Sequence, residues 1–434
     1  MALSKKPYKG TRDFFPDQKR IQDYIFSIMH KTSQSFTFEH FDGPLLEEVD
    51  LYSAKSGEEL INDQIYSFYD RGERFVAIRP EMTPTVARMV SQVHKNITKP
   101  IRWYSIPNVY RYEKPQRGRL REHWQLNCDI FGATDRYGEI EIIQLAIQLM
   151  KNFGASEKEF EILINDRQIV DHVFKNLMNL ADEKVHRLYK VVDKAKKVPR
   201  EAIEKMVNEI DISEEAQTIF YQYLDLKDFD KLSSFLKSHN FETNFLDLIE
   251  TLRNIGLDKY LTYDPTIVRG LDYYTGIVFE IFDKHPDNRR AICGGGAYAN
   301  LLQIFNEDPL PGVGFGMGDV TLTDFLQTHE LLPENIMSPD IHLLMTVQDT
   351  NALPMSLTLA TNLRDQGLDI ATEYNCLKFK KVFSLAEKKG AQFVSFMGED
   401  EINSNQIQIK NMKTRDQKNF DLTNVTEIVN FLKS

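Results

Sequence analysis

The segment His123–Gly132 constrains the fold most, because it reads as a strand with two chemically different faces. Side chains along a strand point alternately to its two sides. The polar residues of one face alternate with the apolar residues of the other: His123, Gln125, Asn127 and Asp129 against Trp124, Leu126, Cys128 and Ile130. The pattern therefore predicts a strand that packs on a core through one face and leaves the other free to bind a ligand.

A basic loop leads into this strand. Upstream, Ile101–Glu113 reads as a second strand, so the two strands form a hairpin whose connection lies within Arg111–Arg121. The five basic residues of that segment would repel one another unless an anion binds there. The simpler alternative is an amphipathic hairpin with a solvated basic tip. Arg111 and Glu113 share a face, and an arginine beside a carboxylate that can hold a metal suits a nucleoside triphosphate.

The loop and strand resemble motif 2 of the class II aminoacyl-tRNA synthetases. In particular, Arg-Tyr-Glu-Lys-Pro-Gln at 111–116 and Gln-Leu-Asn-Cys-Asp at 125–129 resemble the histidyl-tRNA synthetase family. Two further segments match that family: Arg79–Thr83 (Arg-Pro-Glu-Met-Thr) and Val268–Gly276, with its Arg-Gly-Leu-Asp-Tyr-Tyr signature. The resemblance extends from Gly-Thr-Arg-Asp at 10–13 to the end of the chain, and only a helical insertion carries no signature.

The resemblance implies an α+β fold in two domains. We expect a class II catalytic domain with an antiparallel sheet over 1–330, interrupted by a helical insertion at about 172–262. An α/β anticodon-binding domain, shared by the histidyl, prolyl, threonyl and glycyl enzymes, is expected over 339–434. Sequence patterns agree, since a chain of 434 residues is too long for one core. The insertion is rich in Leu, Lys, Glu and Asp, and strand and helix signals alternate from Ile341 to Met397.

Periodicity predicts the individual elements. Helices are expected at Arg20–Phe36, Pro84–His94 (with Thr83 as cap), Tyr137–Phe153, Ala297–Phe305 and after Gly314–Gly318. Strands are expected at Phe38–Tyr52, Glu159–Asn165, Ile267–Phe282 and Arg290–Cys293, with a hairpin at Tyr66–Arg79. Pro44 restricts the first of these strands to a sheet edge or an interface. In the C-terminal part the expected order is Ile341–Val347, Ala352–Gln366, Leu368–Tyr374, Phe379–Lys389 and Phe393–Met397, strands alternating with helices.

The resemblance also implies the roles of residues in adenylation of histidine and its transfer to tRNA(His). Arg111 and Arg269 would be catalytic and, with Glu113, would bind ATP; Glu113 would also hold the Mg²⁺ that accompanies ATP. The histidine site would comprise Glu81, Thr83, Gln125, Asp129, Tyr273, Tyr274 and Tyr298. Gln116 and Arg119 are candidates for contacting the tRNA acceptor end. Taken alone, Val268–Gly276 could serve packing, and Glu81 could complement a helix dipole.

Two departures from the family pattern leave alternatives open. Ala297 stands where the family usually has an arginine, and Thr321 stands where class II enzymes usually place the ATP-binding arginine of motif 3. Either another cation serves ATP, or the chain is a paralogue without activation, such as a regulatory subunit of ATP phosphoribosyltransferase. The retained Arg111, Glu113 and Arg269 favour the enzyme, as does the C-terminal module. A prolyl, threonyl or glycyl enzyme would not explain residues 269–274.

Charge and composition limit the partners. A net charge of -11 argues against indiscriminate nucleic-acid binding but allows local basic surfaces, at 111–121 and at Lys378, Lys380 and Lys381. Those lysines alone would be a solvated helix face. The three cysteines indicate neither disulfides nor a zinc site, and we expect buried thiols. We expect a cytoplasmic homodimer with the Pro44 segment at its interface, no membrane contact and no tightly bound cofactor.

Overall fold

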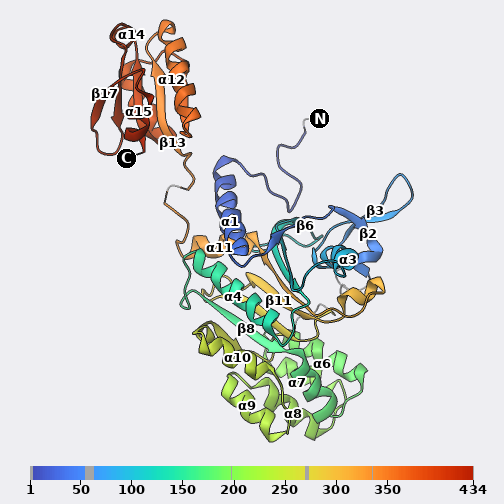
Figure 1. The fold of residues 1–434 in the computed structure, drawn as a ribbon. Helices are drawn as coiled ribbons and strands as arrows, with labels where there is room; N and C mark the ends of the chain where they lie inside the picture. The colour runs from blue at the N-terminus through green and yellow to red at the C-terminus, as the bar shows by residue number, and fades with distance from the viewer. Residues whose placement is uncertain (1–2, 54–62, 197, 269–272, 335, 434) are drawn as a thin grey trace. The chain divides into compact units, whose positions relative to one another are not determined.

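The computed structural model describes residues 3–53, 63–196, 198–268, 273–334 and 336–433 (Figure 1). The chain divides into two compact units. The first comprises Met1–Phe14 and Gln22–Leu332, and the second comprises Phe15–Ile21 and Pro333–Ser434. Each unit has its own sheet, which confirms the α+β class. Among the described helices, none combines the length and apolar character needed to cross a membrane.

A nine-stranded sheet forms the centre of the first unit. Its strands, in spatial order, are β1 (Glu39–His40), β5 (Ile101–Ser105), β7 (Glu122–Phe131), β12 (Gly312–Gly318), β11 (Cys293–Tyr298), β10 (Ile277–Asp283), β8 (Phe160–Asp166) and β9 (Leu261–Tyr263), with β6 (Asn108–Tyr110) also paired to β7. Its central pairs are antiparallel, as predicted, whereas β1–β5 and β8–β9 at the two edges are parallel.

Helices cover the apolar face of this sheet. They are α1 (Pro16–Ser35), α4 (Tyr137–Asn152) and α11 (Asp319–Thr328), and α4 and α11 both contact β7 and β12. Leu126, Cys128 and Ile130 of β7 are buried beneath them, and Ser33 of α1 contacts the Cys128 thiol at 3.6 Å. Packing on this side explains why the alternation in β7 was a reliable strand signal, and it turns the polar side chains to the opposite face.

A small sheet and two helices precede β5. The sheet has the order β2 (Leu46–Glu48), β4 (Phe75–Ile78) and β3 (Tyr66–Tyr69), which confirms the predicted hairpin of Tyr66–Arg79. The helices are α2 (Val49–Ser53) and α3 (Thr83–Val93). The prediction that Thr83 caps α3 is wrong, because Met82 is the N-cap residue and no side chain makes the capping hydrogen bond.

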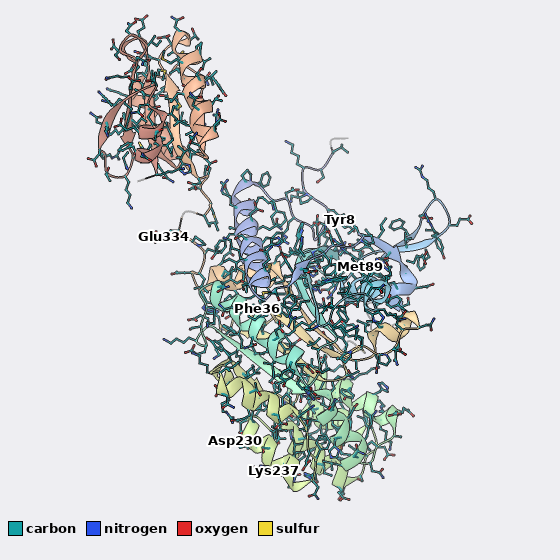
Figure 2. The ribbon with its side chains drawn as sticks, in the orientation of Figure 1. Tyr8, Phe36, Met89, Asp230, Lys237 and Glu334 are labelled. Atoms are coloured by element: carbon teal, nitrogen blue, oxygen red, sulfur yellow. The ribbon has the colours of Figure 1, made fainter. Side chains whose placement is uncertain are left out.

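The chain between β8 and β9 is helical, as the sequence indicates. It contains α5 (Arg167–Asp171), the π-helix η2 (His172–Leu177), α6 (Asp182–Lys194), α7 (Arg200–Asn208), α8 (Glu214–Leu224), α9 (Phe229–Ser238), α10 (Phe245–Asn254) and the 3₁₀ turn η3 (Asp258–Tyr260). These helices are amphipathic: on α9, Asp230 and Lys237 are exposed (Figure 2) while Leu232 and Leu236 are buried. The insertion therefore has its own apolar core.

The second unit contains a five-stranded sheet in the order β14 (Ile370–Glu373), β13 (Ile341–Val347), β15 (Ala391–Met397), β16 (Gln406–Asn411) and β17 (Gln417–Asp421). Its helices are α12 (Leu353–Asp365), α13 (Phe379–Lys389), α14 (Glu399–Ser404) and α15 (Val425–Leu432), and η5 (Thr350–Ala352) is a 3₁₀ turn. The pairs β13–β14 and β13–β15 are parallel, as expected for strands joined by helices. The five predicted elements from Ile341 to Met397 are confirmed.

Three predicted elements differ from the structure. Phe38–Tyr52 is not one strand but β1, β2 and α2, and Ile101–Glu113 divides into β5 and β6 around Pro107. The predicted helix Ala297–Phe305 is wrong: β11 continues to Tyr298, and only the 3₁₀ turn η4 (Leu301–Phe305) follows. The glycines expected to lead into that helix lie within β11, and close neighbours of Gly295 and Gly296 leave no room for larger side chains.

Two further expectations need adjustment. The strand predicted at Ile267–Phe282 begins only at Ile277, as β10, and residues 269–272 lie outside the described part of the chain. Cys128 and Cys293 are buried thiols as expected, but Cys376 is exposed. Its segment, Tyr374–Lys378, connects a strand to a helix at the surface, where periodicity gives no information about burial.

Candidate active site

A cavity of about 860 Å³ lies against the polar face of β7 in the first unit. Of the residues proposed from the sequence, those that line it are Glu81, Thr83, Arg111, Glu113, Arg119, Gln125, Asp129, Tyr273, Tyr274 and Tyr298. The sheet, the 114–121 loop and the helical insertion all contribute to its wall. Residues from distant parts of the sequence thus meet in one concave site.

Glycines of β12 make room for the polar side chains of β7. Gly314 pairs with Asp129 and Gly316 with Asn127 in the antiparallel register. A Cβ at Gly314 would lie 2.3 Å from Asp129 Oδ1, and one at Gly316 would lie 2.3 Å from Gln125 Nε2. Because any side chain there would occupy the place of these polar groups, the glycines form the floor of the cavity.

Asp129 is a buried carboxyl group, and only one of its two oxygens accepts a hydrogen bond from a described residue. Tyr298 donates a hydrogen bond from Oη to Asp129 Oδ1. Within the described residues, Asp129 Oδ2 is buried and has no hydrogen-bond donor. Burial raises the pKa of Asp129 to about 7, although the Tyr298 hydrogen bond opposes that rise. The carboxyl group can therefore accept a hydrogen bond from a ligand inside the cavity.

Three tyrosines surround the two buried acids. The ring of Tyr273 lies 4.8 Å from that of Tyr274 and 5.8 Å from that of Tyr298, in edge-to-face contacts. Tyr273 Oη also donates to Glu81 Oε2 at 3.3 Å, and Glu81 is only 3% exposed. We call Glu81, Asp129 and these three tyrosines the acidic half of the cavity. A small cation or a polar ring would be enclosed there by aromatic walls.

Arginines and one carboxylate form the other half. Arg111 donates from Nε to the Pro80 carbonyl at 2.9 Å, which fixes its side chain at the cavity wall. Arg119 Nε pairs with Glu113 Oε2. Arg290, which sequence reasoning did not single out, also lines this side. We call Arg111, Glu113, Arg119 and Arg290 the cationic half.

The pKa of His123 reflects the positive charge of the cationic half. It lies on the polar face of β7 and lines the cavity. Burial, together with the nearby charges of Arg111, Arg12 and Arg119, lowers its pKa to about 3. His123 is therefore neutral at physiological pH, and the surrounding positive charge favours an anion.

The remaining sequence-derived candidates lie elsewhere or cannot be placed. Gln116 is exposed, is not among the lining residues, and forms a backbone bridge with Arg119 that closes the loop. Arg269 lies outside the described residues. Ala297 is buried in β11 and does not line the cavity, whereas Thr321 does.

Sequence reasoning missed several lining residues. Asp193 and Lys196 come from the helical insertion, and Glu280 comes from β10. Lys196 pairs with Asp264, so the insertion is tied to the wall of the cavity. No local pattern marks these positions, because only the tertiary fold brings the insertion beside the sheet. Arg289 and Arg290 come shortly before a glycine-rich strand, but that pair alone does not single out either residue as a ligand.

The antiparallel sheet, the motif 2 hairpin on β7 and a cavity divided into acidic and cationic halves define a class II aminoacyl-tRNA synthetase. A family model described as histidyl-tRNA synthetase matches residues 10–320, and one described as an anticodon binding domain matches 341–432. The chain belongs to the histidyl-tRNA synthetase family.

Similar proteins cover nearly the whole chain. A histidine–tRNA ligase of Leptospira biflexa is 39% identical over 97% of this chain and 96% of its own length. One of Thermoplasma volcanium is 36% identical over 98% of this chain and 97% of its own length. The crystal structure of histidyl-tRNA synthetase from Nostoc sp. PCC 7120 has the same fold, with a TM-score of 0.83, 22% identity and coverage of 100% and 99%.

Proposed function

We propose that this chain joins L-histidine to ATP, forming histidyl-adenylate and pyrophosphate, and then transfers the histidyl group to tRNA(His). The observation that carries the proposal is the single cavity with two buried carboxyl groups at one end and arginines at the other. Histidine brings an ammonium group and an imidazole N–H, and ATP brings phosphates. The two halves of the cavity match these two sets of groups.

The acidic half would bind histidine. Glu81 would pair with the α-ammonium group, and Thr83, which also lines the cavity, starts α3. Asp129 Oδ2 would accept the imidazole N–H, because it is a buried acceptor without a described donor. Gln125, with Nε2 held by Asn127 at 2.9 Å, would contact the substrate through its carbonyl oxygen. Tyr273, Tyr274 and Tyr298 would enclose the ring.

The cationic half would bind ATP. In adenylation, a carboxylate oxygen of histidine forms a bond to the α-phosphorus while the bond from that phosphorus to pyrophosphate breaks. Two anions approach each other, so positioning and positive charge are the main requirements. Arg111 would stabilise the charge from the cavity wall. Arg269, by the family signature, would bridge the histidine carboxylate and the α-phosphate.

Magnesium would accompany ATP as part of the substrate. The donor set fits a hard cation, because Glu113 supplies carboxylate oxygens beside the arginines and Glu280 is a second carboxylate on the cavity wall. When bound there, Mg²⁺ would neutralise phosphate charge. We expect no tightly bound cofactor beyond these substrates.

The tRNA would contact two places. Arg119 and Gln116, in the loop at the cavity, are candidates for the acceptor end. The C-terminal unit would read the anticodon, and we retain the proposed division into a catalytic domain over 1–330 and an anticodon-binding domain over 339–434. Lys410 lies 4.9 Å from the centre of the Phe383 ring, which places one cation beside α13 on this unit. Lys378, Lys380 and Lys381 add positive charge near the start of the same helix.

A homodimer is proposed from an apolar surface on the small sheet. Leu45 and Leu46 near Pro44 are exposed, and so are Phe68, Tyr69 and Phe75 on the adjoining hairpin. The rings of Tyr69 and Phe75 stack 4.9 Å apart. Exposed apolar residues gathered on one small sheet favour an interface between subunits. We expect the dimer to act in the cytoplasm.

Histidine-dependent exchange of labelled pyrophosphate into ATP tests the proposal, with the other amino acids as controls. We expect exchange with histidine alone, and its loss in a folded Arg269→Ala variant. Absence of exchange in a folded dimer that still binds histidine would favour the regulatory subunit of ATP phosphoribosyltransferase. Exchange with proline, threonine or glycine in place of histidine would indicate a related enzyme.

A further inference from the structure

We infer that Arg290 supplies the ATP-binding cation at the position where other class II enzymes use the motif 3 arginine and this chain has Thr321. The inference rests on the proposed function, since it assigns a residue to the triphosphate of ATP. It explains how a chain with a threonine at that position can still clamp its nucleotide.

Arg290 and Thr321 meet at one point beside the motif 2 loop. A Cβ built on Gly118 would lie 2.9 Å from Arg290 Cδ and 3.3 Å from Thr321 Cγ2. The two side chains therefore reach the same place, although they come from different elements, the β10–β11 connection and α11. An arginine extending from position 321 would compete with Arg290 for that space. The short Thr321 leaves it open.

Gly118 itself is adapted to this contact. Its φ of +71° lies in the left-handed region, which residues with a Cβ rarely adopt. A Cβ at 118 would also displace the Arg290 side chain, so glycine favours this close approach of the loop. The backbone of the motif 2 loop and the Arg290 side chain are thus packed as one surface.

Among the described cations that line the cavity, Arg290 is the one without a hydrogen-bond acceptor or ion-pair partner. Arg119 pairs with Glu113, Lys196 pairs with Asp264, and Arg111 donates to the Pro80 carbonyl. Arg289 is exposed and donates to the Pro286 carbonyl of its own loop. Arg290 is half-buried, and burial and the charge of Arg119 lower its pKa, while the charge of Glu113 opposes them. A phosphate group beside Arg290 would favour its charged form.

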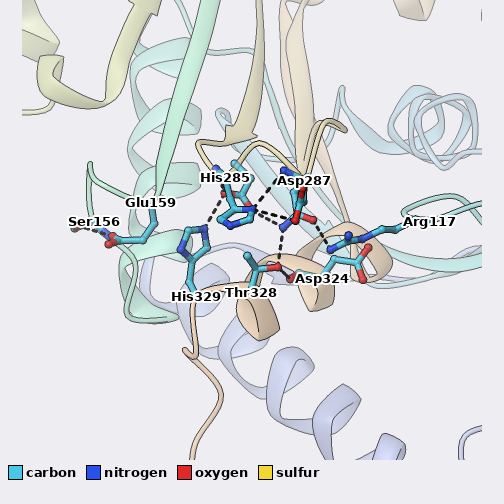
Figure 3. Close-up of polar contacts among 10 residues, drawn as sticks. Arg117, Ser156, Glu159, His285, Asp287, Asp324, Thr328 and His329 are labelled. Atoms are coloured by element: carbon cyan, nitrogen blue, oxygen red, sulfur yellow. Dashed lines mark hydrogen bonds and ion pairs between the residues drawn. The ribbon is translucent and has the colours of Figure 1, made fainter.

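A polar network holds the connection that carries Arg290 (Figure 3). Asn288 donates from Nδ2 to Asp283 at 2.6 Å and to Thr328 of α11 at 3.0 Å, and it accepts from Arg117 of the motif 2 loop at 2.9 Å. His329 contacts the other Asp283 oxygen at 2.8 Å. The network therefore fixes the loop, α11 and the residues just before Arg290 relative to one another.

The test compares Arg290→Ala with the double variant Arg290→Ala/Thr321→Arg in pyrophosphate exchange. We expect Arg290→Ala to lower kcat/KM for ATP by roughly 100-fold, as for loss of a charged donor to a transition-state oxygen, and to change KM for histidine less than about twofold. In the double variant, the arginine at 321 should recover at least about tenfold of the lost kcat/KM, since its side chain enters the space that Arg290 vacates. Arg290→Lys should fall between wild type and Arg290→Ala.

Arg253→Ala is the matched control, because Arg253 lies on α10 in the insertion and pairs with Glu250 on the surface. It should leave both KM values unchanged. An unchanged KM and kcat for ATP in Arg290→Ala would overturn the inference, and so would equal losses toward ATP and histidine. A folded double variant without recovery would overturn the replacement of the motif 3 arginine.

Titration calorimetry with ATP and Mg²⁺ separates this inference from the proposed function. If the wild type binds ATP but shows no histidine-dependent exchange, the proposed function fails, and weaker ATP binding by Arg290→Ala still supports the role of Arg290. If the wild type exchanges normally and Arg290→Ala binds ATP equally well, only the assignment of Arg290 fails.

Discussion

The strand residues of the acidic half and the arginines of the cationic half are held in different ways. Asp129 and Tyr298 lie on neighbouring parts of one sheet, in strands whose register fixes their spacing. Arg119 and Arg290 lie on the 111–121 loop and the β10–β11 connection. Groups on strands keep their places through backbone hydrogen bonds and buried packing, whereas groups on loops depend on side-chain contacts.

The difference indicates where substitution can be compensated. A cation acts on a phosphate mainly through charge and reach, so an arginine can approach from another loop. A buried carboxyl group with a tyrosine donor and a glycine opposite cannot be moved without changing the whole register. The proposed site fits this view, because its expected acids and tyrosines line the cavity, whereas Thr321 stands where an ATP-binding arginine is expected.

The largest effect is expected in the acidic half. Glu81→Gln keeps the size of a buried side chain but removes the charge that would pair with the ammonium group. We expect a fall in kcat/KM for histidine of about 1,000-fold or more, since the partner charge is left unpaired in a buried site. Pyrophosphate exchange at varied histidine concentration measures it. A loss below about tenfold would remove Glu81 from the ammonium site.

The glycine floor gives a matched pair of variants on one strand. Gly316→Ala places a Cβ 2.3 Å from Gln125 Nε2, whereas Gly318→Ala meets only Thr321 Oγ1, at 3.7 Å. We expect about a 100-fold loss in kcat/KM for histidine from the first and a clearly smaller loss from the second, because displacement by about an ångström is costly in an active site. Similar losses would mean that the Gln125 contact is not what matters.

The pH dependence of histidine use should follow Asp129. Its carboxylate accepts a hydrogen bond best when ionised, and its pKa is about 7. As pH falls from 8 to 6, we expect kcat/KM for histidine to fall by up to about tenfold. Asp129→Asn should be less active at all pH values. Its kcat/KM for histidine should no longer fall with titration of residue 129, so that only titration of the substrate changes it. An unchanged profile in Asp129→Asn would contradict the assignment.

Ionisation of Asp129 should favour histidine use but lower the stability of the folded chain. Its pKa in the folded chain is about 7 against an ordinary 3.8, so its contribution to stability is fully present below pH 3.8 and is lost as pH rises through about 7. Without histidine, the Tm of Asp129→Asn relative to wild type should therefore be higher at pH 8 than at pH 5. Calorimetric scans measure this difference, and the reverse trend would mean that Asp129 is stabilised in its ionised form.

The smallest effect is expected from the network behind the cationic half. Asn288→Ala removes the contacts to Arg117 and Thr328 and should loosen the residues that present Arg290. We expect a rise of about three- to tenfold in KM for ATP, with KM for histidine unchanged. Equal changes in both constants would indicate a general loss of folding instead.

Sequence patterns gave the elements that bury a regular face. The alternation in β7, the helical period of α4 and the strands and helices from Ile341 to Met397 were all predicted, because each element contacts a core along its length. The pattern failed at Gly294–Gly296, where glycines usually signal a turn. Here all three lie within β11, and Phe315 and Tyr274 occupy the space that Cβ atoms of Gly295 and Gly296 would need.

Residues of the candidate site could be predicted only within the motifs that resemble the family. Ten of the proposed residues do line the cavity, among them Glu81 and Asp129, but their roles rest on the family signature. Arg290 could not be chosen from the sequence, since its importance comes from its meeting with Gly118 and Thr321 across separate elements. Lys196 likewise reaches the cavity from an insertion that carries no signature.

Charging of tRNA(His) with labelled histidine tests the central claim most directly, because it requires both halves of the cavity and the C-terminal unit. With ATP and Mg²⁺ present, we predict that histidyl-tRNA accumulates with tRNA(His) and not with a non-cognate tRNA. Failure to charge tRNA(His), by a folded chain that binds both ATP and histidine, would contradict the account.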